Sequence, residues 1–177
     1  MRWRCGKLAA VVVAGTVTVA ACAQTVDGAA RRATTSAPDP ERSYGYVDDR
    51  CGLLQDSTVQ DMLGAESVVR PYSGAVCQYV LVRATGLVDV VFSWFETGTL
   101  DRERDLATDR GAQVMDTDIE RHPAFTATTE GNPAACAATA AAGTGVLTWW
   151  VQFRPSTGMN ACRDAEALLA ATLSSDM

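Results

Sequence analysis

The sequence predicts an α+β fold: an antiparallel sheet of about five strands with two to three helices, stapled by two disulfides. Three observations carry this prediction. Runs rich in β-branched and aromatic residues occupy 87–95 and 146–153, as is typical of strands. Segments with helical spacing lie before, between and after such runs. An apolar share of 47 % with 20 % charged residues is that of a chain that folds around a core.

The first expected elements are a short helix and a hairpin. Asp56 or Ser57 can cap a short helix, Ser57 and Gln60 form a capping-box pattern, and Gly64 favours the end of that helix. Strands are expected at 77–82 and 87–95 because both runs are apolar and a glycine turn separates them.

A second helix is expected over 99–110, ending at Gly111, followed by short strands at 113–115 and 125–129. The alanine-rich stretch 134–142 is ambiguous, since alanine prefers helix. The glycines at its end and the strand 146–153 favour a hairpin whose first arm is this stretch.

The last expected element is a C-terminal helix. Asn160 is a suitable N-cap, and apolar residues recur with helical spacing on one face. That face carries Ala165, Leu168, Leu169 and Leu173.

Residues 1–21 are typical of a lipoprotein signal peptide. Three basic residues precede the uncharged run 8–21, whose 14 residues would span about 21 Å as a helix, too short to cross a bilayer. The ending Val19-Ala-Ala-Cys22 resembles the bacterial lipoprotein signal, in which the cysteine is acylated. An ordinary signal peptide with an incidental cysteine is the alternative. We expect a lipid anchor on Cys22, a flexible tether over 22–47 and one domain over 48–177.

The charge of the chain restricts its partners. The formal net charge is −6, and removal of the signal would leave 12 arginines against 21 acidic residues, or −9. Such a surface is unsuited to nucleic acid and is repelled by anionic lipid headgroups. We therefore expect attachment to the extracytoplasmic face of the cell membrane through the lipid alone.

Four cysteines remain after the signal and Cys22 are set aside: Cys51, Cys77, Cys136 and Cys162. An even count in an exported chain predicts two disulfides, for which three pairings exist. We favour Cys51–Cys77 and Cys136–Cys162, because each joins sequence neighbours across 26 residues.

The order of these motifs resembles a known group of proteins. Cys51-Gly-Leu-Leu54 opens a helix, Cys77 opens a strand, and Cys162 opens the last helix. With Cys22, this resembles the actinobacterial, mycobacterial-type lipoproteins classed as a domain of unknown function, over residues 48–174. The start of the last helix is also similar to the two-disulfide extracellular sensor domain of mycobacterial receptor kinases. Neither resemblance implies catalytic residues.

No catalytic, metal or cofactor site is expected. His122 is the single histidine, and because it precedes Pro123 we expect it to be exposed in a turn. The acidic residues of 101–110 alternate with arginines, as on a solvated helix face. Asp116 and Asp118 lack the further ligands of a calcium loop.

One surface is a candidate binding groove. Adjacent strand residues point to opposite sides, so Trp149 and Trp150 cannot both enter one core. We expect Trp94 and Trp149 to be buried and Trp150 to be partly exposed. Val91, Phe95 and Trp150 would then line an apolar groove; cover of both sheet faces by helices is the alternative.

The function favoured by these features is that of a membrane-anchored extracytoplasmic lipoprotein, a binding or accessory module without catalysis. Its partner would be an envelope protein or an apolar ligand. The alternatives are an exported envelope-acting hydrolase, a ligand-sensing domain and a structural spacer.

Overall fold

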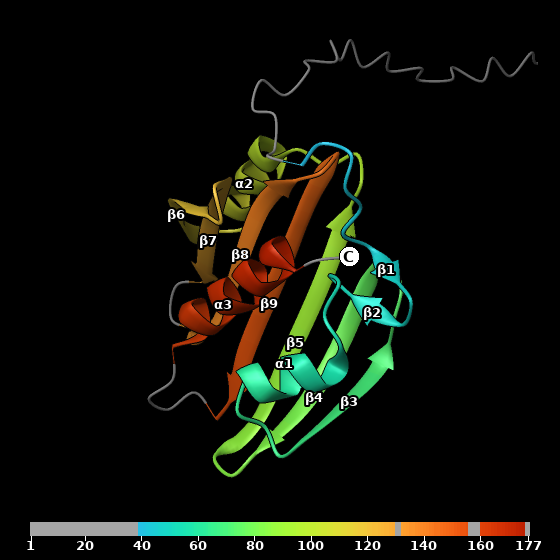
Figure 1. The fold of residues 1–177 in the computed structure, drawn as a ribbon. Helices are drawn as coiled ribbons and strands as arrows, with labels where there is room; N and C mark the ends of the chain where they lie inside the picture. Colours follow the sequence, from blue (N-terminus) through green and yellow to red (C-terminus); the bar gives the residue numbers. More distant parts are fainter. Residues whose placement is uncertain (1–38, 130–131, 156–159, 176–177) are drawn as a thin grey trace, which may run out of the picture. The chain divides into compact units, whose positions relative to one another are not determined.

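The computed structural model describes residues 39–129, 132–155 and 160–175 (Figure 1). The signal peptide, Cys22 and most of the expected tether lie outside the described residues.

The main sheet is fully antiparallel and has seven strands in the order β3-β4-β5-β9-β8-β7-β6. A separate two-stranded sheet pairs β1 with β2. The predicted fold class is confirmed, but the prediction of about five strands was too low. The bounds are β1 (Tyr46–Val47), β2 (Arg50–Cys51), β3 (Ser67–Tyr72), β4 (Val76–Arg83), β5 (Gly86–Phe95), β6 (Ala112–Ile119), β7 (His122–Thr129), β8 (Asn132–Ala142) and β9 (Gly145–Arg154).

The alanine-rich stretch forms a strand because of the residues opposite it. β8 lies between β7 and β9, where Ala138 pairs with Trp149 and Ala140 pairs with Leu147. Small side chains leave room for the large ones of the neighbouring strand and for the helix above them. Packing thus overrides the helical preference of alanine.

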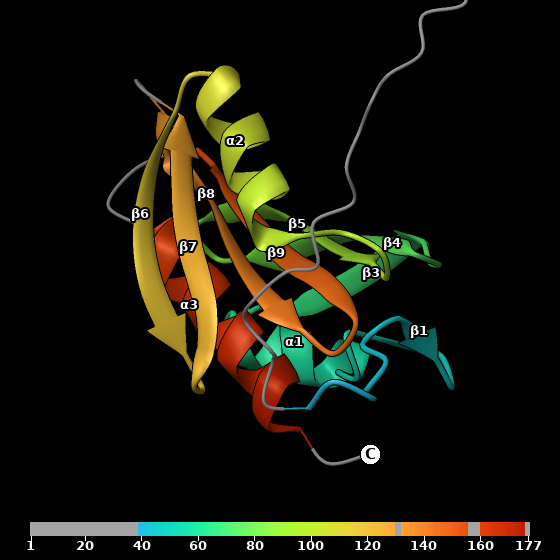
Figure 2. The same cartoon turned by 90° about the horizontal axis from the view of Figure 1, so that it is seen from above.

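Three helices cover the sheet: α1 (Asp56–Met62), α2 (Leu100–Asp109) and α3 (Ala161–Ser174). Figure 2 shows α2 and α3 on opposite sides of the sheet. The Asn160 side chain accepts a hydrogen bond from the Arg163 N–H at 3.1 Å, so the predicted cap of α3 is confirmed. The predicted capping box of the first helix is wrong, since α1 begins after Gln55 without a side-chain cap.

The core lies between the sheet and the layer of α1 and α3. Trp149 is fully buried at its centre, with ring centroids of Phe92 and Tyr79 at 5.0 and 6.1 Å. Its indole N–H donates a hydrogen bond of 2.9 Å to the Thr172 hydroxyl, which fixes α3 over β9.

The favoured disulfide pairing is confirmed. Cys51–Cys77 joins β2 to β4, and Cys136–Cys162 joins β8 to α3. Both bonds therefore fasten a peripheral element to the same side of the main sheet.

The folded part begins before Asp48, the boundary expected for the tether. Tyr44 is fully buried, and its ring centroid lies 5.7 Å from that of Trp94. A buried aromatic residue in a polar segment produces no periodic pattern, so nothing in the sequence indicated that Tyr44 is part of the core. Among the residues that the structure describes, no helix has both the length and the apolar composition of a membrane span.

Candidate functional site: the open face of the sheet

One part of the sheet carries apolar side chains that no described helix buries. α1 and α3 pack on one side, while α2 lies on the other side and contacts β6, β7 and β8 (Figure 2). We call the α2 side of β3, β4, β5 and β9 the open face.

The open face is rich in apolar side chains that contact water. Val69 and Tyr72 of β3 are 63 and 61 % exposed, and Val82 and Leu87 are also exposed. Val80, Val91 and Trp150 are half-buried.

Strand register joins these residues across the sheet. One row, which we call the Trp150 row, runs through Tyr72, Gln78, Val91 and Trp150. With strands about 4.8 Å apart, the row extends for roughly 14 Å. Two aromatic residues with an aliphatic and an amide side chain between them form a shallow strip.

The alternation of side chains along β9 puts one tryptophan on each side of the sheet. Trp149 and Trp94 are buried on the side of α1 and α3, whereas Trp150 is partly exposed on the open face. The expectation for all three tryptophans is confirmed.

The structure brings two of the three predicted groove residues together. Val91 and Trp150 are direct register partners. Phe95 shares their side of the sheet but pairs with Val146, four residues and roughly 13 Å further along β5. Phe95 is 45 % exposed, beside the loop that leads to α2.

Polar groups border the apolar strip. Arg154 donates a hydrogen bond of 2.7 Å to the Asp89 carboxylate across β5 and β9. Gln152 pairs with Asp89 in the register, and Gln78 lies within the Trp150 row. The charges on this border are paired, so the open face presents mainly apolar and amide groups.

A small hollow lies at the end of the sheet near the turn between β4 and β5. It encloses only about 10 Å³, room for about one water molecule, and Arg83, Leu87, Phe153 and Pro155 contribute to its lining. Pockets for small molecules usually enclose about 300–1,000 Å³. The open face itself is therefore suited to a macromolecule rather than to an enclosed ligand.

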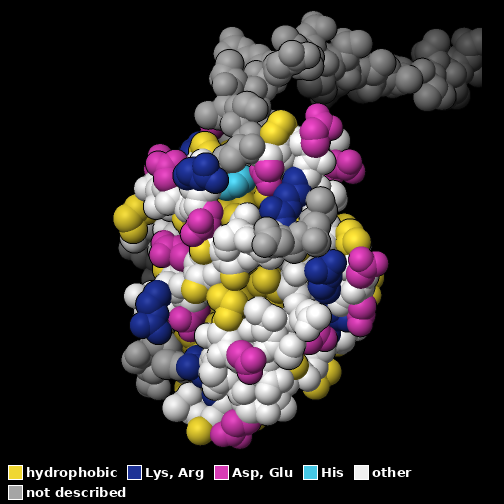
Figure 3. All heavy atoms as spheres, in the orientation of Figure 1, with side chains coloured by type: hydrophobic (Ala, Val, Ile, Leu, Met, Phe, Trp, Pro, Cys, Tyr) yellow, Lys and Arg dark blue, Asp and Glu magenta, His cyan; other side chains and the backbone are white. Residues whose placement is uncertain are grey.

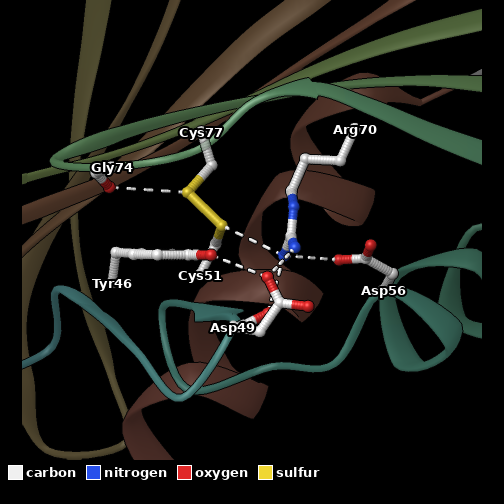
Figure 4. The surroundings of a disulfide bond; sticks show 7 residues. All are labelled: Tyr46, Asp49, Cys51, Asp56, Arg70, Gly74 and Cys77. Atoms are coloured by element: carbon white, nitrogen blue, oxygen red, sulfur yellow. Dashed lines mark hydrogen bonds and ion pairs between the residues drawn. A yellow bond between two sulfur atoms is a disulfide. The ribbon is translucent and has the colours of Figure 1, made fainter.

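Arg70 forms the centre of a polar cluster beside the Cys51–Cys77 disulfide (Figure 4). Its guanidinium donates to the Asp49 backbone carbonyl at 2.7 Å and to the Asp56 carboxylate at 2.9 Å, and it also pairs with the Asp49 carboxylate. The hydrogen bond from the Tyr46 hydroxyl, together with Arg70, lowers the pKa of Asp49. These bonds connect β3, the β1–β2 turn and α1, so the role of the cluster is structural.

His122 is 3 % exposed, and the expectation of an exposed turn histidine was wrong. The turn is formed by Glu120 and Arg121, and His122 is the first residue of β7. Its Nδ1 lies 2.9 Å from the Ala141 carbonyl oxygen, which can only accept, so Nδ1 carries a proton. Its Nε2 lies 3.8 Å from the Asp39 carboxylate.

Asp39 connects the segment 39–44 to the turn between β8 and β9. Its carboxylate accepts hydrogen bonds from the Tyr44 hydroxyl and, at 3.4 Å, from the Gly143 N–H. Burial and the neighbouring Asp39 raise the pKa of Tyr44 well above its ordinary value. The histidine therefore belongs to a structural junction.

Most charged side chains of α2 are solvated as expected, but those of Glu103 and Arg104 are only 20 and 29 % exposed. Arg104 binds Asp101 at 2.8 Å and Asp116 at 2.9 Å, and its guanidinium lies 5.6 Å from the Phe125 ring centroid.

Within the described ranges, no group of three or more His, Cys, Asp or Glu side chains is arranged to hold a metal ion.

The sequence model of a protein family, described as a protein of unknown function (DUF3558), matches residues 17–175. The chain belongs to the DUF3558 family. No curated protein and no solved structure matches it significantly. The family assigns no activity to this DUF3558 protein, so its surfaces are the guide to its function.

The site of this DUF3558 protein contains residues that sequence reasoning missed. Val69 and Tyr72 are the most exposed apolar residues of the open face, yet β3 was not predicted. The sequence indicates strand β3 only weakly, because Pro71 interrupts an otherwise β-branched run. The segment Ser67-Val-Val-Arg70 is the part of the sequence that could have indicated this strand.

Proposed function

We propose that this DUF3558 protein is a membrane-anchored extracytoplasmic lipoprotein whose open face binds another protein of the cell envelope. A basic start, a short apolar run and Val19-Ala-Ala-Cys22 support the anchor. Two disulfides support an oxidising compartment. The Cys51-Gly-Leu-Leu54 opening and the lysine-free mature chain fit actinobacterial lipoproteins.

The observation that carries the binding role is the Trp150 row. Tyrosine and tryptophan are enriched at the energetic centres of protein interfaces, and a border of satisfied polar groups is typical of their rims. Tyr72 is 61 % exposed and Trp150 is partly exposed in the described structure. Burial of both side chains by a partner would remove two aromatic rings of the Trp150 row from water.

Among the described residues, the side of α1 and α3 presents no comparable row of exposed aromatic side chains. In Figure 3, the side of α1 and α3 shows acidic and basic side chains interspersed, with apolar side chains in smaller groups between them. Neither a uniform charge nor one apolar surface dominates this side. The open face is therefore the better candidate for specific contact.

The anchor is tested by Cys22→Ala. We expect metabolic labelling with a palmitate analogue to mark the wild type and not the variant, because the thiol is the acyl acceptor. Equal labelling of both proteins would contradict the lipoprotein assignment.

The binding role is tested by a photo-crosslinking residue at position 72, with position 62 on α1 as the matched control. Met62 is also exposed, at 38 %, but lies on the other side of the molecule. In intact cells we expect a discrete adduct from position 72 that Trp150→Ala abolishes. The same adducts from both positions, or an adduct insensitive to Trp150→Ala, would contradict binding through the open face.

A further inference from the structure

The main sheet has two edge strands, β3 and β6. An edge strand presents unpaired backbone N–H and C=O groups, to which another extended chain can add. Proteins usually block such edges with proline, bulges or charged side chains, most often lysine. The two edges of this sheet differ in how they are blocked.

β3 carries two of these blocks. Pro71 lacks a backbone N–H, and the register with β4 shifts between Val69 and Tyr72. Both features interrupt the regular row of donors and acceptors that an added strand needs.

β6 has neither a proline nor a bulge, and its only charged residues are Asp116 and Asp118. Its eight residues pair with β7 without a register shift, and they include no proline, lysine or arginine. In the part of the chain that the structure describes, β7 is its only strand partner.

The turn after β6 shows which backbone groups point outward. Glu120 and Arg121 have φ of 50° and 65°, as in a two-residue type I′ turn, which the pair Ile119–His122 closes with hydrogen bonds. Hydrogen-bonded pairs alternate along an antiparallel ladder. The N–H and C=O groups that face away from β7 therefore belong to Ala112, Val114, Asp116 and Asp118.

The charge near this edge favours a basic partner. Residues 101–121 contain seven acidic side chains against four arginines. Asp116 is paired with Arg104, whereas exposed Asp118 forms no ion pair with any described residue. On the other side of the strand, Met115 is 68 % exposed, more than any other large apolar side chain among the described residues.

We propose that β6 is a docking edge for an extended, basic peptide segment that adds as an eighth strand to the sheet. Its backbone bonds to the outward groups of Val114, Asp116 and Asp118. Its basic side chains lie on the side of the two aspartates, and an apolar side chain lies beside Met115. The β6 edge is separate from the open face. An experiment that contradicts peptide docking at β6 therefore does not contradict binding through the open face.

The test uses the full chain as isolated from cells and an eight-residue peptide of alternating lysine and valine, matched to the length of β6. A peptide with glutamate in place of lysine is the control ligand. We expect the lysine peptide to slow amide exchange at Val114, Asp116 and Asp118, and to bind at least about tenfold more tightly than the glutamate peptide.

Two variants separate backbone pairing from charge. Val114→Pro removes an outward N–H without removing a bond to β7, and we expect it to abolish protection by the peptide. Asp118→Lys should weaken the lysine peptide by about tenfold, whereas Asp109→Lys, an exposed α2 position with the same charge change, should have a smaller effect.

Several outcomes would overturn the proposal. Unchanged peptide affinity in Val114→Pro, equal binding of both peptides, absence of binding, or protection confined to another surface would each do so. A concentration-dependent dimer that Val114→Pro abolishes would assign the edge to a second copy of the chain instead.

Discussion

Trp149 and Trp150 show how one residue step changes the role of the same side chain. Trp149 is fully buried and hydrogen-bonded to Thr172, while Trp150 faces the open side. We expect Trp149→Ala to lower the free energy of unfolding by about 3–5 kcal/mol and Trp150→Ala to cost clearly less. Chemical denaturation of both variants measures the difference. Equal losses would show that position 150 belongs to the core.

Gly143 is where the entering segment approaches the main sheet. Its φ is +50°, and a Cβ there would overlap the Arg42 carbonyl oxygen. Gly111→Ala is the matched control, because its φ is +79° but no atom lies within 4 Å of the added Cβ. Both variants incur backbone strain of about 1–2 kcal/mol. We expect only Gly143→Ala also to accelerate amide exchange over 39–44; unchanged exchange there would contradict the close approach.

Tyr79 gives the fold a dependence on alkaline pH. Burial, and secondarily the Asp56 carboxylate, raise its pKa from 10.0 to about 12. The folded state therefore binds the phenol proton of Tyr79 more tightly than the unfolded state does. The contribution of this proton to the free energy of unfolding is fully present below pH 10 and is lost as the pH rises from 10 to 12. We expect phenolate absorbance to show an ionisation near pH 12 that Tyr79→Phe removes. An unchanged titration of Tyr79→Phe would contradict this assignment.

At the scale of elements, α2 is held differently from the other helices. None of its residues is buried, whereas α3 buries six. Arg104 pairs with Asp101 within the helix and with Asp116 of β6, and its guanidinium covers the Phe125 ring. α2 should therefore open locally at a lower free-energy cost than α3.

Hydrogen exchange tests this difference. In Arg104→Met, which keeps an apolar stem over Phe125, we expect α2 amides to exchange faster by a factor of a few while α3 is unchanged. Arg102→Met is the control, because Arg102 is 67 % exposed and pairs only with the adjacent Glu103. Equal protection of α2 and α3 in the wild type would contradict local opening.

Elements with a strong local pattern, or with a clear neighbour in the sequence, were predicted, and an element with neither was not. β5 and β9 combine apolar alternation with β-branched residues, so their positions and facing were predictable. β8 was favoured as the first arm of a hairpin only because a glycine turn and β9 follow it, and the pairing of its alanines with Trp149 and Leu147 confirms this arm. β3 was missed because Pro71 conceals an edge strand.

At the scale of the whole molecule, alternation along β9 predicted that Trp150 would face away from Trp149. It could not predict that both α1 and α3 pack on the Trp149 side. The choice of side depends on long-range contacts such as the Trp149–Thr172 hydrogen bond and the Cys136–Cys162 bond. The side of the sheet to which Trp150 points was thus predictable from local geometry. That α1 and α3 leave this side open depends on tertiary packing and was not predictable.

The two disulfides allow a direct test of how the whole fold is stabilised. Each closes a loop of the same sequence separation, 26 residues, so the chain-entropy model assigns both an equal contribution of roughly 3–4 kcal/mol. Their surroundings differ, since Arg70 also ties the Cys51 region to Asp49 and Asp56. We therefore expect the double variant Cys51→Ala/Cys77→Ala to keep β2 near β4, and Cys136→Ala/Cys162→Ala to loosen α3.

Denaturant unfolding of both double variants gives the free energies, and hydrogen exchange locates the change. Equal losses of stability, with new exchange confined to α3 in the second variant, are the expected result. Adding Arg70→Met to the first variant should then expose β1 and β2 to exchange, because the ion pairs of Arg70 with Asp49 and Asp56 are lost together with the disulfide. If β1 and β2 stayed protected in that triple variant, the Arg70 cluster would not be what holds them to the sheet.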